Sequence, residues 1–333
     1  MGVLWRADAI PSTRLELGDA AVAWPLAARA QRPPLPVIGW LDSASLGERR
    51  EVLAGFHTGL QEISYREGQN VMLAYSWAEH LSERIAPLAI DLARRQVAVI
   101  VASGAACALA AKEATAKIPI VFGTGGDPVR LGLVSSLNRP GGNLTGVATL
   151  GNALASKQLQ LLRDLAPGAK AIAYLTNPTN PNAQSDVNDV QTAAGALRLQ
   201  VNVLNASTPN DIDLAFATIA RQQLSGVLVA NDPFLNSRVS QVAQLALTQK
   251  LPSVFPHREA VPVGGLISYG AILMETGRAM GIYTGRILRG DKPGDLAIVQ
   301  AAKFQFVINL ITAKSLGLTV PPALLAIADE VFE

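Results

Sequence analysis

The fold is decided by residues 91–122, DLARRQVAVIVASGAACALAAKEATAKIPIVF. Their continuous apolar run at 97–102 is typical of a parallel strand that is buried on both faces. Ser103-Gly104 then opens an alanine-rich helical pattern that extends to residue 116, and a second apolar run follows at 118–122. A strand, a helix and a second strand in this order predict a β–α–β unit whose two strands run parallel.

The same alternation continues on both sides of this unit. Before it, strand patterns at 37–41 and 71–77 flank a helical pattern at 48–63. After a strand pattern at 145–149 the alternation starts again and continues to the end of the chain. The strand patterns of this second series lie at 171–175, 200–204, 227–230, 252–255, 265–269 and 304–308, with helical patterns at 154–165, 183–197, 211–222, 234–248 and 274–288. Two successive series predict an α/β protein with two similar doubly wound lobes that contain parallel sheets.

Length and composition exclude several classes of protein. Of the 333 residues, 49% are hydrophobic and 16% are charged, and the net charge is +2. This apolar fraction is too high for a disordered chain, and the small net charge gives no electrostatic footprint for nucleic acid. Cys107 is the single cysteine, which excludes an internal disulfide framework and a cysteine-based zinc site. No run of about 18 apolar residues predicts a transmembrane helix.

Sequence motifs for catalysis or metal binding are lacking. The three histidines, His57, His80 and His257, show no metal-ligand spacing. No nucleophile elbow, zinc-protease helix or P-loop pattern occurs. The loop Gly123-Thr124-Gly125-Gly126 follows a strand but lacks the spacing of a phosphate loop, and Asp127 would repel a phosphate. We therefore expect neither an enzyme nor a bound metal or cofactor.

Short polar residues follow the predicted strands. In open α/β sheets, ligands bind outside the carboxyl ends of the strands. Each such residue taken alone is better explained by turn and cap chemistry. The set, however, falls at the same end of both lobes and predicts a site for a small, hydrogen-bonded ligand. The set consists of Ser43, Ser45, Ser103, Thr124, Asp127, Asn177, Asn180, Asn182, Asn231, Asp232 and Tyr269.

Residues 1–35 are interpreted as a signal-like leader and linker. Residues 20–30, AAVAWPLAARA, end in Ala28-Arg29-Ala30, the small-residue pattern that signal peptidase cleaves. Glu16 and Asp19 lie where the apolar region of an export signal should extend, so the signal is atypical. The alternative is a disordered leader in which the pattern occurs by chance.

Several motifs together resemble one known family. DPVRLGLVSSLNRPGGNLTGV at 127–147, LTNPTNPNA at 175–183 and KFQFVINLITAKSLGLTVPP at 303–322 are similar to the substrate-binding proteins of ABC transporters of the tryptophan/tyrosine type. The resemblance covers about residues 20–333. It implies a type I periplasmic-binding-protein fold, with two Rossmann-like lobes, three crossovers and a ligand in the cleft. It further implies that lobe 1 comprises 36–148 plus about 265–290, and lobe 2 comprises 149–264 plus about 291–333.

The resemblance also implies a set of ligand-binding residues. Serine hydroxyls and N–H groups at helix N-termini would hold a carboxylate without a fixed positive charge, and Asp232 or Asp127 would pair with an ammonium group. An aromatic ring would cover an apolar side chain; the candidates are Trp40, Phe122, Phe234 and Tyr269. The implied binding residues are Ser43, Ser45, Ser103, Gly104, Thr124, Asp127, Asn177, Asn182, Asp232 and Tyr269.

The function implied by the resemblance is that of a periplasmic solute-binding protein. It would close on an amino acid, or on an aromatic or carboxylate compound, and deliver it to the permease and ATPase subunits of an ABC importer. No catalytic residue, cofactor, nucleic-acid partner or integral membrane segment is implied. One alternative is a cytoplasmic ligand-sensing regulator on the same fold, which would need a helix-turn-helix ahead of the lobes; residues 1–35 show no such helix pair. Another is a hydrolase or amidase, against which the missing catalytic constellation counts.

Overall fold

The computed structural model describes residues 1–2, 34–149 and 151–333. The chain separates into two units, Met1–Pro34 and Leu35–Glu333, and all helices and strands of the described residues belong to the second unit. The expected leader at 1–35 lies almost wholly outside the described residues. Within the described ranges, no helix combines the length and the apolar character needed to span a membrane.

Lobe 1 is built on a six-stranded parallel sheet with the order β11-β5-β4-β3-β1-β2. Its strand order reverses direction between β1 and β3, as in doubly wound sheets. The strands are β1 (Val37–Asp42), β2 (Met72–Trp77), β3 (Val99–Ser103), β4 (Ile120–Thr124), β5 (Leu144–Ala148) and β11 (Val299–Gln300). The helices are α1 (Arg50–Glu62), α2 (Ser82–Arg94), α3 (Ala105–Ala114) and α9 (Leu273–Leu288), with short 3-10 turns η1 (Leu46–Arg49) and η3 (Pro293–Asp295).

Lobe 2 contains a seven-stranded sheet with the order β13-β12-β10-β9-β8-β6-β7. Its first five strands along the chain repeat the order of lobe 1, with the reversal between β6 and β8. The strands are β6 (Ala171–Thr176), β7 (Gln200–Asn205), β8 (Val227–Val229), β9 (Ser253–Phe255), β10 (Ile267–Ala271), β12 (Phe304–Asn309) and β13 (Glu330–Phe332). The helices are α4 (Gly151–Leu165), α5 (Ala183–Ala196), α6 (Pro209–Gln222), α7 (Pro233–Ser237), α8 (Val239–Thr248), α10 (Leu310–Ser315) and α11 (Pro322–Ile327), with one 3-10 turn, η2 (Arg258–Ala260).

The chain passes between the lobes three times: after β5, after β10 and after β11. The third passage brings the chain back into lobe 2 from the end at which β10 left it, so β12 runs antiparallel to β10. The segment that returns to lobe 1 extends from α9 to β11, that is over 273–300. The expected limits of 265 and 290 differ from this, because β10 pairs with β9 in the sheet of lobe 2 and β11 pairs with β5 in the sheet of lobe 1.

Local sequence explains where several helices begin and end. The Thr208 hydroxyl accepts a hydrogen bond from the Asp211 N–H, and Pro209 occupies the first turn, so α6 begins there. Gly290, with φ of 106°, follows the end of α9, a conformation that glycine adopts at little cost. The helical pattern at 234–248 was expected to be one helix, but a non-helical Arg238 separates α7 from α8.

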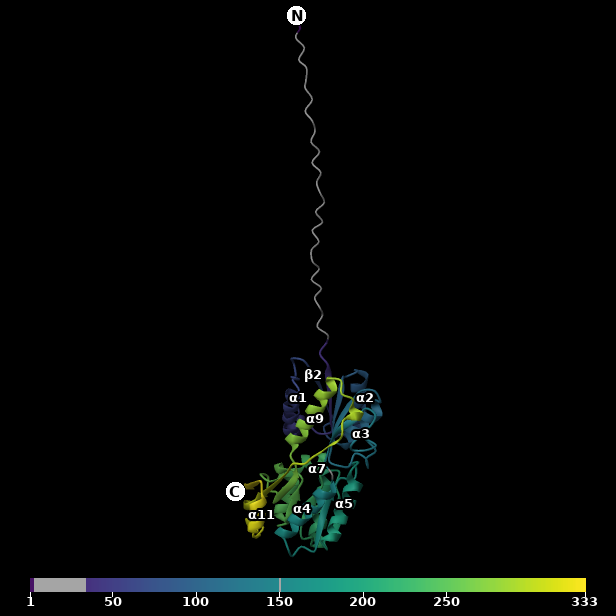
Figure 1. The fold of residues 1–333 in the computed structure, drawn as a ribbon. Coiled ribbons are helices and arrows are strands. Elements are labelled where there is room, and N and C mark those ends of the chain that lie inside the picture. Colours follow the sequence, from purple (N-terminus) through teal and green to yellow (C-terminus); the bar gives the residue numbers. More distant parts are fainter. Residues whose placement is uncertain (3–33, 150) are drawn as a thin grey trace. The chain divides into compact units, whose positions relative to one another are not determined.

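Glycines allow α9 to lie directly against α1, as Figure 1 shows for the yellow-green and purple helices of lobe 1. Gly55 and Gly59 of α1 face α9, and Gly277 and Gly281 of α9 face α1. A Cβ atom at any of these positions would overlap a backbone oxygen of the opposite helix. The two helices therefore touch backbone to backbone, and the ion pair between Arg278 and Glu62 closes over the contact, with Nε and Oε1 2.6 Å apart.

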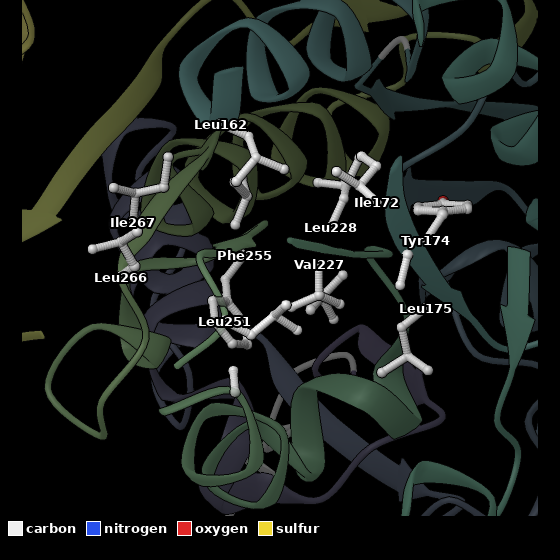
Figure 2. Close-up of a cluster of buried hydrophobic side chains, with 14 of the residues drawn as sticks. Leu162, Ile172, Tyr174, Leu175, Val227, Leu228, Leu251, Phe255, Leu266 and Ile267 are labelled. Atoms are coloured by element: carbon white, nitrogen blue, oxygen red, sulfur yellow. The ribbon is translucent and has the colours of Figure 1, made fainter. Parts of the chain in front are cut away.

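Buried hydrophobic side chains form a core on each face of the lobe 1 sheet and one core in lobe 2. On one face of the lobe 1 sheet, Trp40 packs with α1 and α9; on the other, Phe122 packs with α2 and α3. In lobe 2, the apolar residues of β6, β8, β9 and β10 form one continuous core, of which Figure 2 shows Leu175, Leu228 and Phe255. The prediction of two α/β lobes with mainly parallel sheets is confirmed.

Candidate functional site

A cavity of about 190 Å³, called here the main cavity, lies between the two lobes. Lobe 1 lines it with the loops that follow β1, β2, β3, β4 and β5, and lobe 2 with those that follow β6, β8, β9 and β10. The loops at the two reversals of strand order, β1 with β3 and β6 with β8, therefore face one another, at the position where doubly wound sheets bind ligands. One water molecule needs about 10–15 Å³ of cavity volume. If each non-hydrogen atom of a ligand needs about as much, the main cavity suits a ligand of about a dozen such atoms.

Seven of the ten residues expected to bind ligand line the main cavity; they are Ser43, Ser103, Gly104 and Thr124 from lobe 1, and Asn177, Asn182 and Asp232 from lobe 2. The other three are not among its lining residues, and each has a separate structural role. The Ser45 backbone N–H donates to Glu48 at the start of η1. The Asp127 carboxylate accepts from the Val129 N–H at 2.8 Å and so caps a turn. The Tyr269 ring stacks on Phe304, with the ring centroids 5.8 Å apart.

Of the four aromatic residues proposed to cover a ligand, Phe234 lines the cavity. Trp40 is fully buried instead, with its ring edge-on to Phe56 at 5.1 Å. Phe122 is fully buried in the core beside α2 and α3. Both rings sit on strands of the central sheet, where an aromatic residue stabilises the core by burial of its large apolar surface.

Arg49 contributes a positive charge to the main cavity, which the sequence interpretation had not included. Its Nε donates to Asp42 Oδ1 at 3.1 Å, and its side chain is only 13% exposed. Burial by itself would lower the pKa of Arg49, but the charge and hydrogen bond of Asp42 reverse this, so its pKa is raised and the guanidinium stays charged. Among the described residues, the two terminal amino groups of Arg49 have no hydrogen-bond partner, and they are free to donate to an anion.

Asp232 is the corresponding negative charge from lobe 2. It is 3% exposed and caps the N-terminus of α7 by accepting from the Leu235 N–H at 3.0 Å. Asn177 Nδ2 donates to Asp232 Oδ1 at 3.2 Å, and Asn180 Nδ2 donates to Oδ2 at 2.8 Å. These three donors fix the orientation of the carboxylate. A buried carboxylate and a buried guanidinium on the walls of one cavity are suited to a ligand that carries both charges.

The N-terminus of α3 adds partial positive charge on the lobe 1 side. Ser103, Gly104 and the first residues of α3 line the cavity, and Gly104 adopts φ of 97° as it turns into the helix. Free N–H groups of a first helical turn attract a negatively charged group. Cys107 lies one turn further along and is fully buried, and burial raises the pKa of its thiol. We therefore expect the thiol to be unreactive in the folded protein.

His257 is a neutral wall residue of the main cavity. Burial lowers its pKa to about 4, and the charge of Arg49 acts in the same direction. Its Nε2 lies 2.9 Å from Asn231 Oδ1, which also accepts from Asn236 Nδ2 at 3.3 Å. Since that oxygen is an acceptor, Nε2 carries the proton and Nδ1 is left as an acceptor. His257 Nδ1 is buried and has no partner in the described part of the chain.

The lobes touch beside the main cavity through the loop after β4. A Cβ atom at Gly126 would overlap Asn182 Oδ1, so any other residue there would displace the Asn182 side chain. Arg130 of the same loop forms a two-pronged ion pair with Asp189 of α5, with N–O distances of 2.8 and 3.2 Å. Asp186 lies one turn earlier on α5, and burial raises its pKa to about 7, with the Asp189 carboxylate adding to the effect and Arg130 opposing it.

Sequence reasoning missed Arg49, His80 and His257 as lining residues. Arg49 lies seven residues beyond the end of β1 in the charged run GERRE, which is typical of an exposed helix face. His257 follows β9 by two residues, so the strand-end rule that selected Asn177 and Asp232 would have selected it too. In the described ranges, no group of three His, Cys, Asp or Glu side chains is arranged to hold a metal ion.

The chain is similar in sequence and in fold to several known proteins. The tyrosine-binding protein of Clostridioides difficile (strain R20291) is 26% identical over 264 residues, which are 79% of this chain and 76% of that protein. The structure of an ABC domain from Streptococcus pneumonia in complex with L-Trp is 26% identical and has a TM-score of 0.84, with 90% of this chain and 100% of that chain covered.

A solute-binding protein of a 5-methylthioribose transporter from Thermotoga lettingae is similar in fold alone, with 16% identity, a TM-score of 0.58, and 88% of this chain and 98% of that chain covered. The predicted type I periplasmic-binding-protein fold is thereby confirmed. The sequence profile of one family, described as ABC transporter substrate binding protein, matches residues 41–332. The chain belongs to the ABC transporter substrate binding protein family.

Proposed function

We propose that the protein is the extracytoplasmic solute-binding component of an ABC importer, and that it binds an amino acid or a similar small carboxylate between its two lobes. One observation carries the proposal: Arg49 and Asp232 place opposite buried charges on the walls of the main cavity, one from each lobe. Asp42 contacts Arg49 through Nε, so a zwitterion would bind the terminal amino groups of Arg49 with its carboxylate and Asp232 with its ammonium. It would contact both best when both lobes are closed around it.

The carboxylate of the ligand is assigned to lobe 1. Arg49 offers two terminal amino groups in a planar fork that matches a carboxylate, and the N-terminus of α3 lies on the same wall. The ammonium group is assigned to Asp232, whose three hydrogen-bond donors leave capacity on a carboxylate that has about four acceptor sites. The known ligands of relatives, tyrosine and L-Trp, carry these two groups.

Isothermal titration calorimetry with matched ligands tests this assignment. L-tryptophan is compared with tryptamine, which lacks the carboxylate, and with indole-3-propionate, which lacks the ammonium. Arg49→Gln should weaken L-tryptophan by about tenfold to a thousandfold, because one partner of a buried charged pair is lost, and should leave tryptamine unchanged. Asp232→Asn, which retains the helix cap, should weaken L-tryptophan and leave indole-3-propionate unchanged.

The matched control is Arg84→Gln, since Arg84 is 41% exposed and pairs with Glu79, and neither residue lines the main cavity. Binding of the three ligands by this variant should equal that of the wild type. If wild-type protein binds no amino acid, or if Arg49→Gln binds L-tryptophan as the wild type does, the assignment of the site is wrong.

Export and delivery are proposed with the permease and ATPase subunits of an importer as partners. The expected cleavage before Gln31 gives a direct test: sequencing of the N-terminus of the protein from a periplasmic fraction should begin at Gln31. A full-length chain in the cytoplasm would contradict export, whatever the ligand.

A further inference from the structure

Helix α5 of lobe 2 places two carboxylates, one helical turn apart, near a single arginine of lobe 1. Arg130, in the loop after β4, donates to both carboxylate oxygens of Asp189 at 2.8 and 3.2 Å. Asp186 lies on α5 one turn before Asp189, and its charge also attracts Arg130. A change in the charge of Asp186 therefore alters the strength of a contact that joins the two lobes.

Asp186 and Asp189 line a small cavity of about 40 Å³, called here the α5 cavity. Gly125 and Asn231 line both this cavity and the main cavity. The volume is enough for about three water molecules, so Asp186 can exchange a proton while α5 stays folded. Among the described lining residues, Gly125 alone comes from lobe 1. Most of the burial of Asp186 is thus provided by lobe 2 itself, and it remains when the lobes separate.

The charges that face Asp186 differ in sign between the lobes. Burial raises its pKa to about 7, the carboxylates of Asp189 and Asp232 in lobe 2 add to this effect, and Arg130 of lobe 1 opposes it. Tyr174 of β6 stays protonated, because burial and the charge of Asp186 raise its pKa. Helix α4 contributes no charged side chain to the described lining of the α5 cavity. Separation of the lobes would remove the attraction and leave the repulsion, so the pKa of Asp186 should be higher with the lobes open than with them closed.

We propose that Asp186 is a pH-sensitive switch of lobe closure: its ionised form holds Arg130 and favours closed lobes, and its protonated form favours open ones. The ligand should act in the same direction, since an ammonium group on Asp232 would offset the repulsion between Asp232 and Asp186. Closure and binding should then release protons, and the affinity for the ligand should rise with pH through the range near 7. The inference rests on the proposed function and adds its regulation by pH.

The first test compares wild type with Asp186→Asn, which imitates the protonated carboxyl group. In isothermal titration calorimetry with L-tryptophan, the two proteins should bind alike at about pH 6. At about pH 8 the wild type should bind about twofold to fivefold more tightly than the variant, which is the contribution of one partly exposed ion pair. Titration in buffers of different ionisation enthalpy near pH 7 should show proton release for the wild type and less for the variant. Titration of the ligand itself is common to both proteins and cancels.

Two control variants separate Asp186 from other titratable groups. Asp91→Asn removes a carboxylate that is 57% exposed and should bind as the wild type does at both pH values. His80 lines the main cavity, and histidine is the residue type that most often titrates near neutral pH. His80→Gln should therefore retain the difference that Asp186→Asn removes. A pH effect that His80→Gln abolishes and Asp186→Asn retains would overturn the inference.

The second test needs no ligand. Pulsed EPR measures the distance between spin labels on Lys117→Cys of lobe 1 and Arg221→Cys of lobe 2, both of which are exposed positions. The population with closed lobes should increase from about pH 6 to about pH 8 in the wild-type background and stay constant with Asp186→Asn. If the distances do not change with pH, or change equally in the variant, the inference is wrong. A change that Asp186→Asn removes, together with no binding of amino acids, would support the switch and refute the proposed ligand class. Binding of L-tryptophan with the same pH profile in both proteins would refute the switch alone.

Discussion

Asp186 should destabilise the folded protein at neutral and alkaline pH. Its position in the first turn of α5 would favour a carboxylate by about 0.3–1 kcal/mol. Burial and the neighbouring Asp189 outweigh that effect and the attraction of Arg130, and they raise the pKa of Asp186 from 3.8 to about 7. Asp186→Asn isolates the loss of stability caused by the ionised Asp186 carboxylate, because it keeps the shape of the side chain and removes its ionisation.

The size and the sign of the effect follow from linkage. The shift of the Asp186 pKa from 3.8 to about 7 corresponds to roughly 4 kcal/mol of stability, at about 1.4 kcal/mol per pKa unit. Residual solvation of the carboxylate lowers the expected loss of stability to about 2–4 kcal/mol. Between these two values the folded state binds the proton more tightly than the unfolded state does. The free energy of unfolding of the wild type therefore falls as the pH rises through this window. Asp186→Asn should be more stable than the wild type by the full amount at about pH 8, and equal to it at about pH 4.

Urea unfolding of both proteins at several pH values measures this difference, with equal m-values as a check on two-state behaviour. The two proteins must be compared because His257 changes the free energy of unfolding with pH in the opposite direction. Its pKa is lowered to about 4, so the stability that neutral His257 contributes is lost as the pH falls from about 6.5. That contribution is common to both proteins and cancels in the difference. Asp91→Asn, at a carboxylate that is 57% exposed, should change stability by less than about 0.5 kcal/mol. A stability difference between Asp186→Asn and wild type that does not vary with pH would refute the reasoning.

Three further predictions concern the helix contact, the lobe contact and the thiol. Gly277→Ala places a methyl group against the Val52 carbonyl and should lower the free energy of unfolding by about 2 kcal/mol or more. Urea titration measures this change, and an unchanged midpoint would contradict the close contact of the two helices. Arg130→Gln removes the ion pair between the lobes that Arg130 forms with Asp189, and should raise the Kd for the ligand. Because Arg130 is 45% exposed, the increase should be no more than about fivefold, and smaller at high salt. Cys107 should react with a thiol reagent in urea and not in buffer; fast reaction of the native protein would mean that the thiol is accessible.

The alternation of strands and helices could be predicted because buried parallel strands are continuous apolar runs. The run at 97–102, for example, differs plainly from helical periodicity. Short elements gave no such signal. The two residues of β11 have no periodicity to detect, and the assignment of β10 to a lobe depends on pairing with distant residues, which a local pattern does not contain. The break at Arg238 between α7 and α8 likewise has no glycine or proline to announce it.

The sequence predicted those residues of the candidate site that lie at the ends of strands. Asn177 directly follows β6 and Asp232 lies three residues beyond β8, so topology alone brings them to the cavity. Arg49 reaches the cavity only because η1 turns back towards Asp42, an arrangement that comes from tertiary structure. Asp127 and Ser45 are also near strand ends, but their side-chain or backbone groups are engaged in local turns. Strand-end position is therefore a good guide to a cavity and a poor guide to the direction of an individual side chain.

The return of 273–300 to lobe 1 has a consequence for synthesis on the ribosome. Trp40 of the lobe 1 sheet and Phe56 of α1 belong to the part of the core that α9 and the residues leading to β11 cover. Those covering residues emerge only after the first five strands of lobe 2 have been made. The N-terminal lobe therefore cannot finish folding first. The face that α9 covers stays open to water, and to any chaperone that binds apolar surface, until residues 273–300 have been made.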